Sequence, residues 1–197
     1  MSKFSLTFSL DTIIINSMKY PISDVLADSI RGFRLPRYHE IPDMGLYLEQ
    51  TTKYVNRCIS PLGLEAITSS MIRNYVKQGI IANPIKKQYF ADHIAHLVAL
   101  SCLKLVTPLE HISDLFLMLR RGGIYTVPVA YDYFCAELEN YLYFRFGLKD
   151  SIEKLGKTVS IEKDMLLSGI AAVSHIIFLN TCFRILSEGN QTTEDPQ

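Results

Sequence analysis

A stripe of polar side chains between residues 68 and 79 carries the clearest chemistry that this sequence offers. Ser70, Arg73, Asn74 and Lys77 recur at spacings of three and four residues, so they share one face if the segment is a helix. The face holds two cations, an amide and a hydroxyl, and no acid. Such groups bond the phosphates and base edges of DNA. An ordinary solvated helix surface is the plainer interpretation, so the surroundings have to decide between the two.

The distribution of charge favours the nucleic-acid interpretation. The whole chain is neutral, with 20 Lys and Arg against 20 Asp and Glu. The segment 66–104, however, holds five cations and one acid, whereas the residues from 105 onward carry an excess of acids. Because phosphate neutralisation needs local positive charge, we expect any DNA contact to lie in the middle of the chain, with Lys86 and Lys87 facing the phosphate backbone.

Helix signals place this stripe between two turns. Thr68 is an expected N-cap, and Gly79 is an expected end for the helix that carries the stripe. A short basic turn follows and leads to Tyr89, after which Asp92 is an expected cap for a helix to about 106. Further helices are predicted over 23–33, 44–59, 107–121 (with Thr107 as N-cap), 129–146 and 161–187.

The segment from Ile67 to Ile112 resembles the MerR family of winged helix-turn-helix proteins. Ile72-Arg73-Asn74-Tyr75 and the following Gly79-Ile80 are similar to that family's recognition-helix pattern, which reads Ile-Arg-Tyr-Tyr and then Gly-Leu. Tyr89 matches the aromatic residue that closes the family's wing, although the wing is shorter here. A wider stretch, about residues 20–120, resembles a bacterial family whose domain has no known function. The resemblance implies that DNA is contacted by Ser69, Ser70, Arg73, Asn74, Tyr75, Lys77, Lys86, Lys87 and Tyr89.

The expected fold is all-α, with a MerR-like winged helix-turn-helix core, additional C-terminal helices and a short N-terminal strand. Phe4, Leu6, Phe8 and Leu10 alternate with polar residues, which is the pattern of that strand. The predicted organisation is an N-terminal arm (1–20), the winged domain (21–121), a helical dimerisation or effector region (124–187) and a disordered tail (188–197).

The sequence shows little sign of catalysis or of a cofactor. His93, His96 and His111 with Asp92 have spacings that a metal can use, but packing and exposure explain them more simply. We find no nucleophile motif, phosphate loop or dinucleotide fingerprint, so we expect neither an enzyme nor a cofactor. The four cysteines form no C-x-x-C pair, which favours a reducing, cytoplasmic location.

The run from Met165 to Phe183 contains no formal charge. A membrane span is the alternative to a buried helix, but His175 and Asn180 argue against the membrane. We expect the run to pair two chains into a homodimer. The favoured function is DNA binding by a bacterial transcriptional regulator. A helical protein-interaction module, or a small-molecule sensor whose aromatic segment 129–146 lines a ligand pocket, is the alternative.

Overall fold

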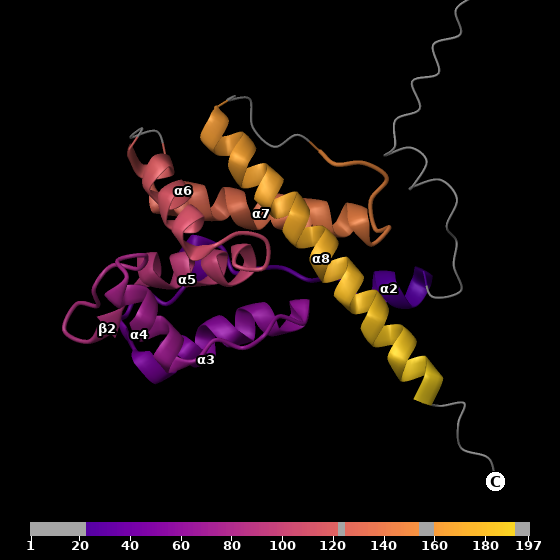
Figure 1. The fold of residues 1–197 in the computed structure, drawn as a ribbon, viewed down its shortest axis with the longest axis horizontal. Helices are drawn as coiled ribbons and strands as arrows, with labels where there is room; N and C mark the ends of the chain where they lie inside the picture. The colour runs from indigo at the N-terminus through magenta and orange to yellow at the C-terminus, as the bar shows by residue number, and fades with distance from the viewer. Residues whose placement is uncertain (1–22, 122–124, 154–159, 192–197) are drawn as a thin grey trace, which may run out of the picture.

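The computed structural model describes residues 23–121, 125–153 and 160–191, and within them the protein is mostly helical, as predicted. Two short strands form the one small sheet of this described part. The expected strand over 4–10 and the arm over 1–20 lie outside the described residues. The elements in chain order are α2 (Ser23–Ile30), η1 (Tyr38–Glu40), β1 (Leu46–Tyr47), α3 (Leu48–Ile59), η2 (Ser60–Leu62), α4 (Ser69–Lys77), β2 (Gln88–Tyr89), α5 (Ala91–Leu103), α6 (Leu109–Arg121), α7 (Val127–Arg145) and α8 (Ile161–Gln191) (Figure 1).

The limits of α4 follow from local sequence as predicted. Thr68 precedes the helix, and its hydroxyl accepts a hydrogen bond of 3.1 Å from the Met71 amide. Gly79 follows the helix with a φ of +74°, which a residue with a Cβ adopts at a cost.

The predicted caps of the two following helices are wrong in detail. Helix α5 begins at Ala91, and the Asp92 carboxylate accepts a hydrogen bond of 2.6 Å from the Tyr38 hydroxyl. The Thr107 hydroxyl lies 3.2 Å from Nδ1 of His111 rather than bonding a backbone amide of α6. In both places the side-chain oxygen that was expected to cap the helix contacts another side chain instead.

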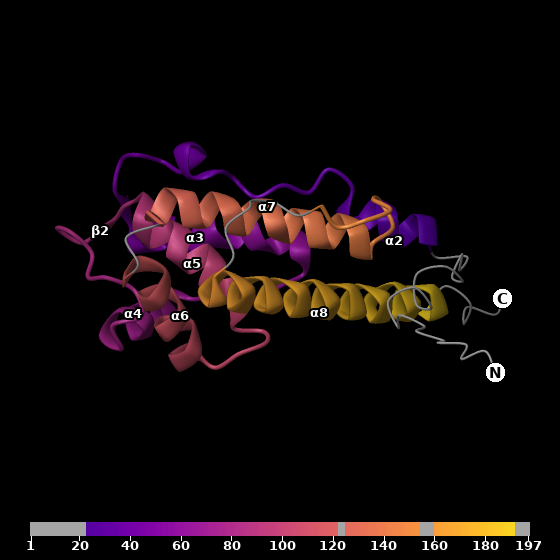
Figure 2. The same ribbon diagram turned by 90° about the horizontal axis from the view of Figure 1, so that it is seen from above.

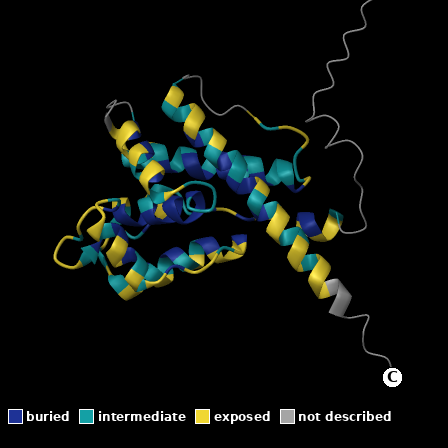
Figure 3. Ribbon diagram, viewed as in Figure 1, coloured by how far each residue is buried: buried dark blue, intermediate teal, exposed yellow. Residues whose placement is uncertain are grey.

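Helix α5 is the centre of the core. It is buried around almost its whole circumference, and α3, α6, α7 and α8 all pack on it (Figures 2 and 3). The buried side chains form one continuous cluster from Leu26 to Ile177, so the two regions that we separated near residue 122 share a single core. Helix α8 approaches α5 closely at Gly169, where an added Cβ would lie 3.1 Å from Cδ2 of Leu103.

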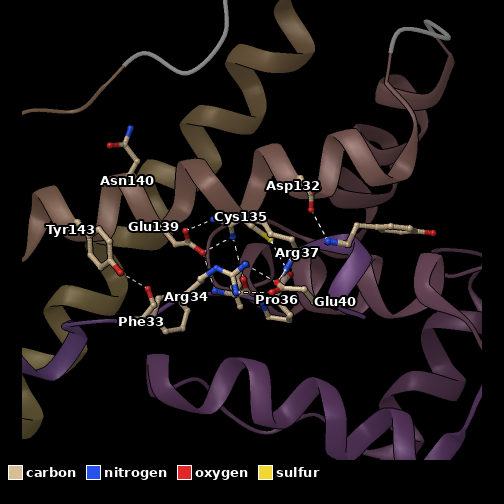
Figure 4. A network of polar contacts seen from close by, with 12 residues as sticks. Phe33, Arg34, Pro36, Arg37, Glu40, Asp132, Cys135, Glu139, Asn140 and Tyr143 are labelled. Carbon is tan, nitrogen blue, oxygen red and sulfur yellow. Dashed lines mark hydrogen bonds and ion pairs between the residues drawn. The ribbon is translucent and has the colours of Figure 1, made fainter. Parts of the chain in front are cut away.

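The irregular connection that follows α2 is fastened to one face of α7 (Figure 4). Glu139 accepts two hydrogen bonds from the Arg37 guanidinium, at 2.7 and 2.6 Å, and a third of 2.9 Å from the Leu35 amide. Asp132 accepts a hydrogen bond of 2.7 Å from the Tyr38 amide. These acids and Tyr143, whose hydroxyl donates to the Phe33 carbonyl, recur at helical spacing. We call this set of contacts the α7 clamp; it gives the two acids a structural role.

Helix α8 is longer than predicted and continues to Gln191, so the expected tail begins later; residues 192–197 lie outside the described part. One face of the helix is buried through Leu166, Ile170, Val173 and Ile177. Its C-terminal half extends away from the end of the molecule that holds α4 and β2 (Figures 1 and 2). By length and composition alone, 161–188 is also apolar enough to cross a membrane: an 18-residue window within it has a mean hydropathy of 1.7, and 28% of that window is buried.

Candidate nucleic-acid interface

Helix α4 presents the predicted polar stripe to solvent. Ser70, Arg73, Asn74 and Lys77 are all exposed, whereas Ile72 is fully buried. The helix is held against α3 by Asn56, whose amide group exchanges two hydrogen bonds, of 2.9 and 2.8 Å, with the backbone of Ile67. The stripe therefore stands on a helix whose orientation is fixed by its neighbour.

Ser69 differs from the rest of the predicted set. Its hydroxyl donates a hydrogen bond of 2.7 Å to Glu49 and lies 3.0 Å from the Thr52 hydroxyl, both of α3. An acidic group thus occupies the N-terminus of α4, where a helix dipole favours negative charge. The Ser69 hydroxyl at this end of α4 is therefore already bonded within the protein.

The predicted basic wing is a tight hairpin. The backbones of Ile85 and Gln88 exchange two hydrogen bonds, of 3.0 and 2.9 Å, which leaves Lys86 and Lys87 as the two residues of the turn. Both lysines are exposed and both have positive φ, at 50° and 66°. A two-residue turn of this kind favours Asn-Gly, because most side chains are strained at positive φ. The hairpin continues into β2, which pairs antiparallel with β1.

Tyr75 and Tyr89 support this surface from beneath. Each is only 4% exposed, so their rings are covered by neighbouring side chains. Burial raises the pKa of Tyr89, and the positive charge of Arg73 opposes that rise. The positive charge of Arg73 on α4 thus acts on Tyr89 in β2, and the two elements lie at the same end of the molecule (Figures 1 and 2).

His93 holds the base of the hairpin, a role that the sequence analysis missed. Its Nδ1 accepts a hydrogen bond of 3.0 Å from the Phe90 amide, so Nε2 carries the proton that is shared with the Asn83 carbonyl 3.2 Å away. The ring also packs edge-on against Tyr89. The sequence places a histidine four residues after Tyr89, which closes the wing, but the carbonyl that it binds lies ten residues back in the chain.

The surface carries unneutralised positive charge. In the part of the chain that the structure describes, none of the five ion pairs involves α4 or the hairpin. The same ranges hold no group of three potential metal ligands; Nδ1 of His96 bonds the Asp92 carbonyl, and Nδ1 of His111 lies beside the Thr107 hydroxyl. Electrostatically, the arrangement suits an extended polyanion.

Comparison with known proteins gives one match. A family model described as a domain of unknown function (DUF1836) matches residues 36–134, which run from the α7 clamp through α4 and the hairpin into α7. Neither the curated proteins nor the solved structures contain a match.

Proposed function

The chain belongs to the DUF1836 family, a domain of unknown function, and on this premise we propose that it binds double-stranded DNA through α4 and the Lys86–Lys87 hairpin. The observation that carries the proposal is the pair of exposed lysines at positive φ beside an acid-free helix face. Strained backbone of this kind persists at functional sites, where the strain is offset elsewhere.

Helix α4 is the element we assign to the major groove, which has the width to admit an α-helix. The Arg73 guanidinium suits the paired acceptors of guanine, and the Asn74 amide suits the donor and acceptor of adenine. Lys77 stands one turn further on and suits a phosphate. In this arrangement Arg73 and Asn74 give sequence specificity.

The hairpin supplies a contact to the phosphate backbone on one side of α4. Lys86 and Lys87 project from the tip, and the strands below them are tied to β1 and to His93. In the MerR-like interpretation, β1, α3, α4 and the hairpin that continues into β2 would together form a winged helix-turn-helix. Glu49 at the start of α4 is a departure, so we assign the phosphate contacts to the C-terminal half of α4 and to the hairpin.

Transcriptional regulation is the role that we propose for this binding. A homodimer would present two such surfaces to a symmetric operator. A family member that retains this architecture for protein interaction is the competing function, and it predicts that the protein has no affinity for DNA.

Fluorescence anisotropy with a random-sequence duplex, at two salt concentrations, tests the proposal directly. We expect binding that weakens steeply with salt, because released counterions drive it. Selection from the same random pool then yields an enriched sequence. Arg73→Ala should lower affinity for that sequence by about 1–3 kcal/mol. Arg184→Ala, which removes an exposed arginine on α8, is the matched control. If the parent protein does not bind duplex DNA at low salt, the proposed function is wrong.

A further inference from the structure

A second candidate site lies away from α4 and the hairpin, in a cavity between α5, α6, α7 and α8. Its volume is about 50 Å³. Apolar side chains from all four helices line it, among them Ala99, Phe116, Phe134 and Leu166. Two basic residues, His96 and Arg120, complete the wall. A mostly apolar cavity with a few convergent polar groups is the usual form of a small-molecule site.

His96 offers the cavity one defined nitrogen. Its Nδ1 lies 2.6 Å from the carbonyl oxygen of Asp92, and because a carbonyl only accepts, Nδ1 carries a proton. The second nitrogen, Nε2, is therefore left for another partner. Phe116 packs edge-on against the imidazole with ring centroids 4.9 Å apart, so the ring is held in place. Burial lowers the pKa of His96, and the charge of Arg120 lowers it further, although the Asp92 contact opposes them.

Arg120 supplies positive charge at the edge of the same cavity. It is exposed, and none of the ion pairs within 23–121, 125–153 and 160–191 involves it. A guanidinium beside an apolar cavity matches a molecule that joins a carboxylate to a hydrocarbon body. The other titratable groups around His96 are Asp92 and His93 on α5 and the cavity tyrosines Tyr125 and Tyr131.

We propose that this cavity binds a short-chain aliphatic carboxylate, with its alkyl group among the apolar side chains and its carboxylate at Arg120, joined by Nε2 of His96 when the imidazole is protonated. The size of the cavity sets the length of the alkyl group. A cavity of roughly 150 Å³ admits benzene, whereas the one here has about a third of that volume. It therefore suits a short alkyl group and is too small for an aromatic ring.

Isothermal titration of the full chain with sodium isovalerate tests this assignment. Isovaleramide, the neutral analogue of nearly the same shape, should bind at least tenfold more weakly, because a charge-assisted hydrogen bond is worth about one decade or more in affinity. Arg120→Gln should weaken isovalerate by a similar factor, whereas Arg184→Gln should leave it unchanged. Ala130→Leu, which places a larger side chain in the cavity wall, should abolish binding.

The pH dependence provides an independent readout. Protonation of His96 adds a donor at Nε2, so isovalerate should bind more tightly at pH 6 than at pH 7.5. The assignment is overturned by failure of the parent protein to bind isovalerate, by equal binding of isovaleramide, or by unchanged binding in a folded Ala130→Leu variant. Circular dichroism and the unfolding temperature establish that each variant is folded. None of these results depends on DNA binding.

Discussion

Nε2 of His93 lies 3.2 Å from the carbonyl oxygen of Asn83, and this contact joins the first turn of α5 to the start of the hairpin. Because Nδ1 of the same ring accepts from the Phe90 amide, one imidazole fixes both ends of the loop that carries Lys86 and Lys87. The position of the basic turn thus depends on His93, a residue that is only 7% exposed.

His93→Ala should therefore loosen the hairpin. We expect the free energy of unfolding to fall by about 1–3 kcal/mol, because buried backbone groups lose their partner, and we expect DNA affinity to fall severalfold. Urea denaturation and anisotropy measure the two effects. His111→Ala is the control, since that histidine is exposed and contacts only the Thr107 hydroxyl. Equal loss in both variants would show that His93 has no special role.

The double substitution Lys86→Asn with Lys87→Gly separates stability from binding. Asn-Gly is the preferred pair for a two-residue turn with positive φ, so the free energy of unfolding should rise by about 1–2 kcal/mol. DNA affinity should fall for all sequences alike, and the salt dependence should become shallower by roughly one counterion for each lysine. Lys86→Ala with Lys87→Ala should lose affinity without gaining stability. If the Asn-Gly variant binds like the parent, the hairpin does not contact DNA.

The α7 clamp allows a test of how burial changes the worth of an ion pair. The Arg37 and Glu139 side chains are 21% and 12% exposed, whereas those of Arg34 and Glu40 are 50% and 36% exposed in a pair of similar geometry. Removing Arg37 leaves a shielded carboxylate unpaired, so Arg37→Ala should destabilise the protein by about 3 kcal/mol. Arg34→Ala should have a much smaller effect. Thermal or urea unfolding measures the stability of the two variants. An equal loss of stability in both would contradict the prediction.

The predicted homodimer can be located on α8. One face of this helix repeats apolar residues at spacings of three and four: Ile176, Leu179, Phe183 and Leu186. The last three are 49%, 64% and 50% exposed. Such a seam suits a second copy of the same helix. Phe183→Glu with Leu186→Glu should convert a dimer into a monomer of 22.4 kDa by light scattering. Met118→Glu, at an exposed apolar residue of α6, should leave the dimer intact. A parent protein that is monomeric, or insoluble without detergent, would refute the dimer.

The elements that the sequence predicted well are those whose signals are local. Thr68 and Gly79 delimit α4 because a cap and a positive φ need only neighbouring residues. The sequence also predicted a basic turn between α4 and Tyr89, and the resemblance to a wing predicted its hairpin form. The Asp92 cap was wrong because its carboxylate bonds a tyrosine 54 residues away. Contacts of that kind have no local periodicity, so spacing alone does not reveal them.

The same limit explains the missed parts of the candidate sites. The apolar walls of the cavity come from four helices, and each helix taken alone looks like ordinary core. Glu139 binds Arg37, which lies 102 residues earlier, so local spacing does not reveal the role of this acid. Ser69 was counted with the DNA-contacting residues because its bond to Glu49 depends on how α3 and α4 pack, which the sequence does not show.

The α7 clamp has a consequence for how the chain folds as it is synthesised. Residues 33–38 bond side chains between Asp132 and Tyr143, and these partners leave the ribosome about one hundred residues later. Until then Leu35, which is fully buried in the finished protein, has no α7 to cover it. Long-range contacts of this kind form late, and segments that wait for them are exposed to aggregation. A nascent chain that stalls after α6 would therefore carry α4 and the hairpin on a core that is still open, which makes it a substrate for chaperones.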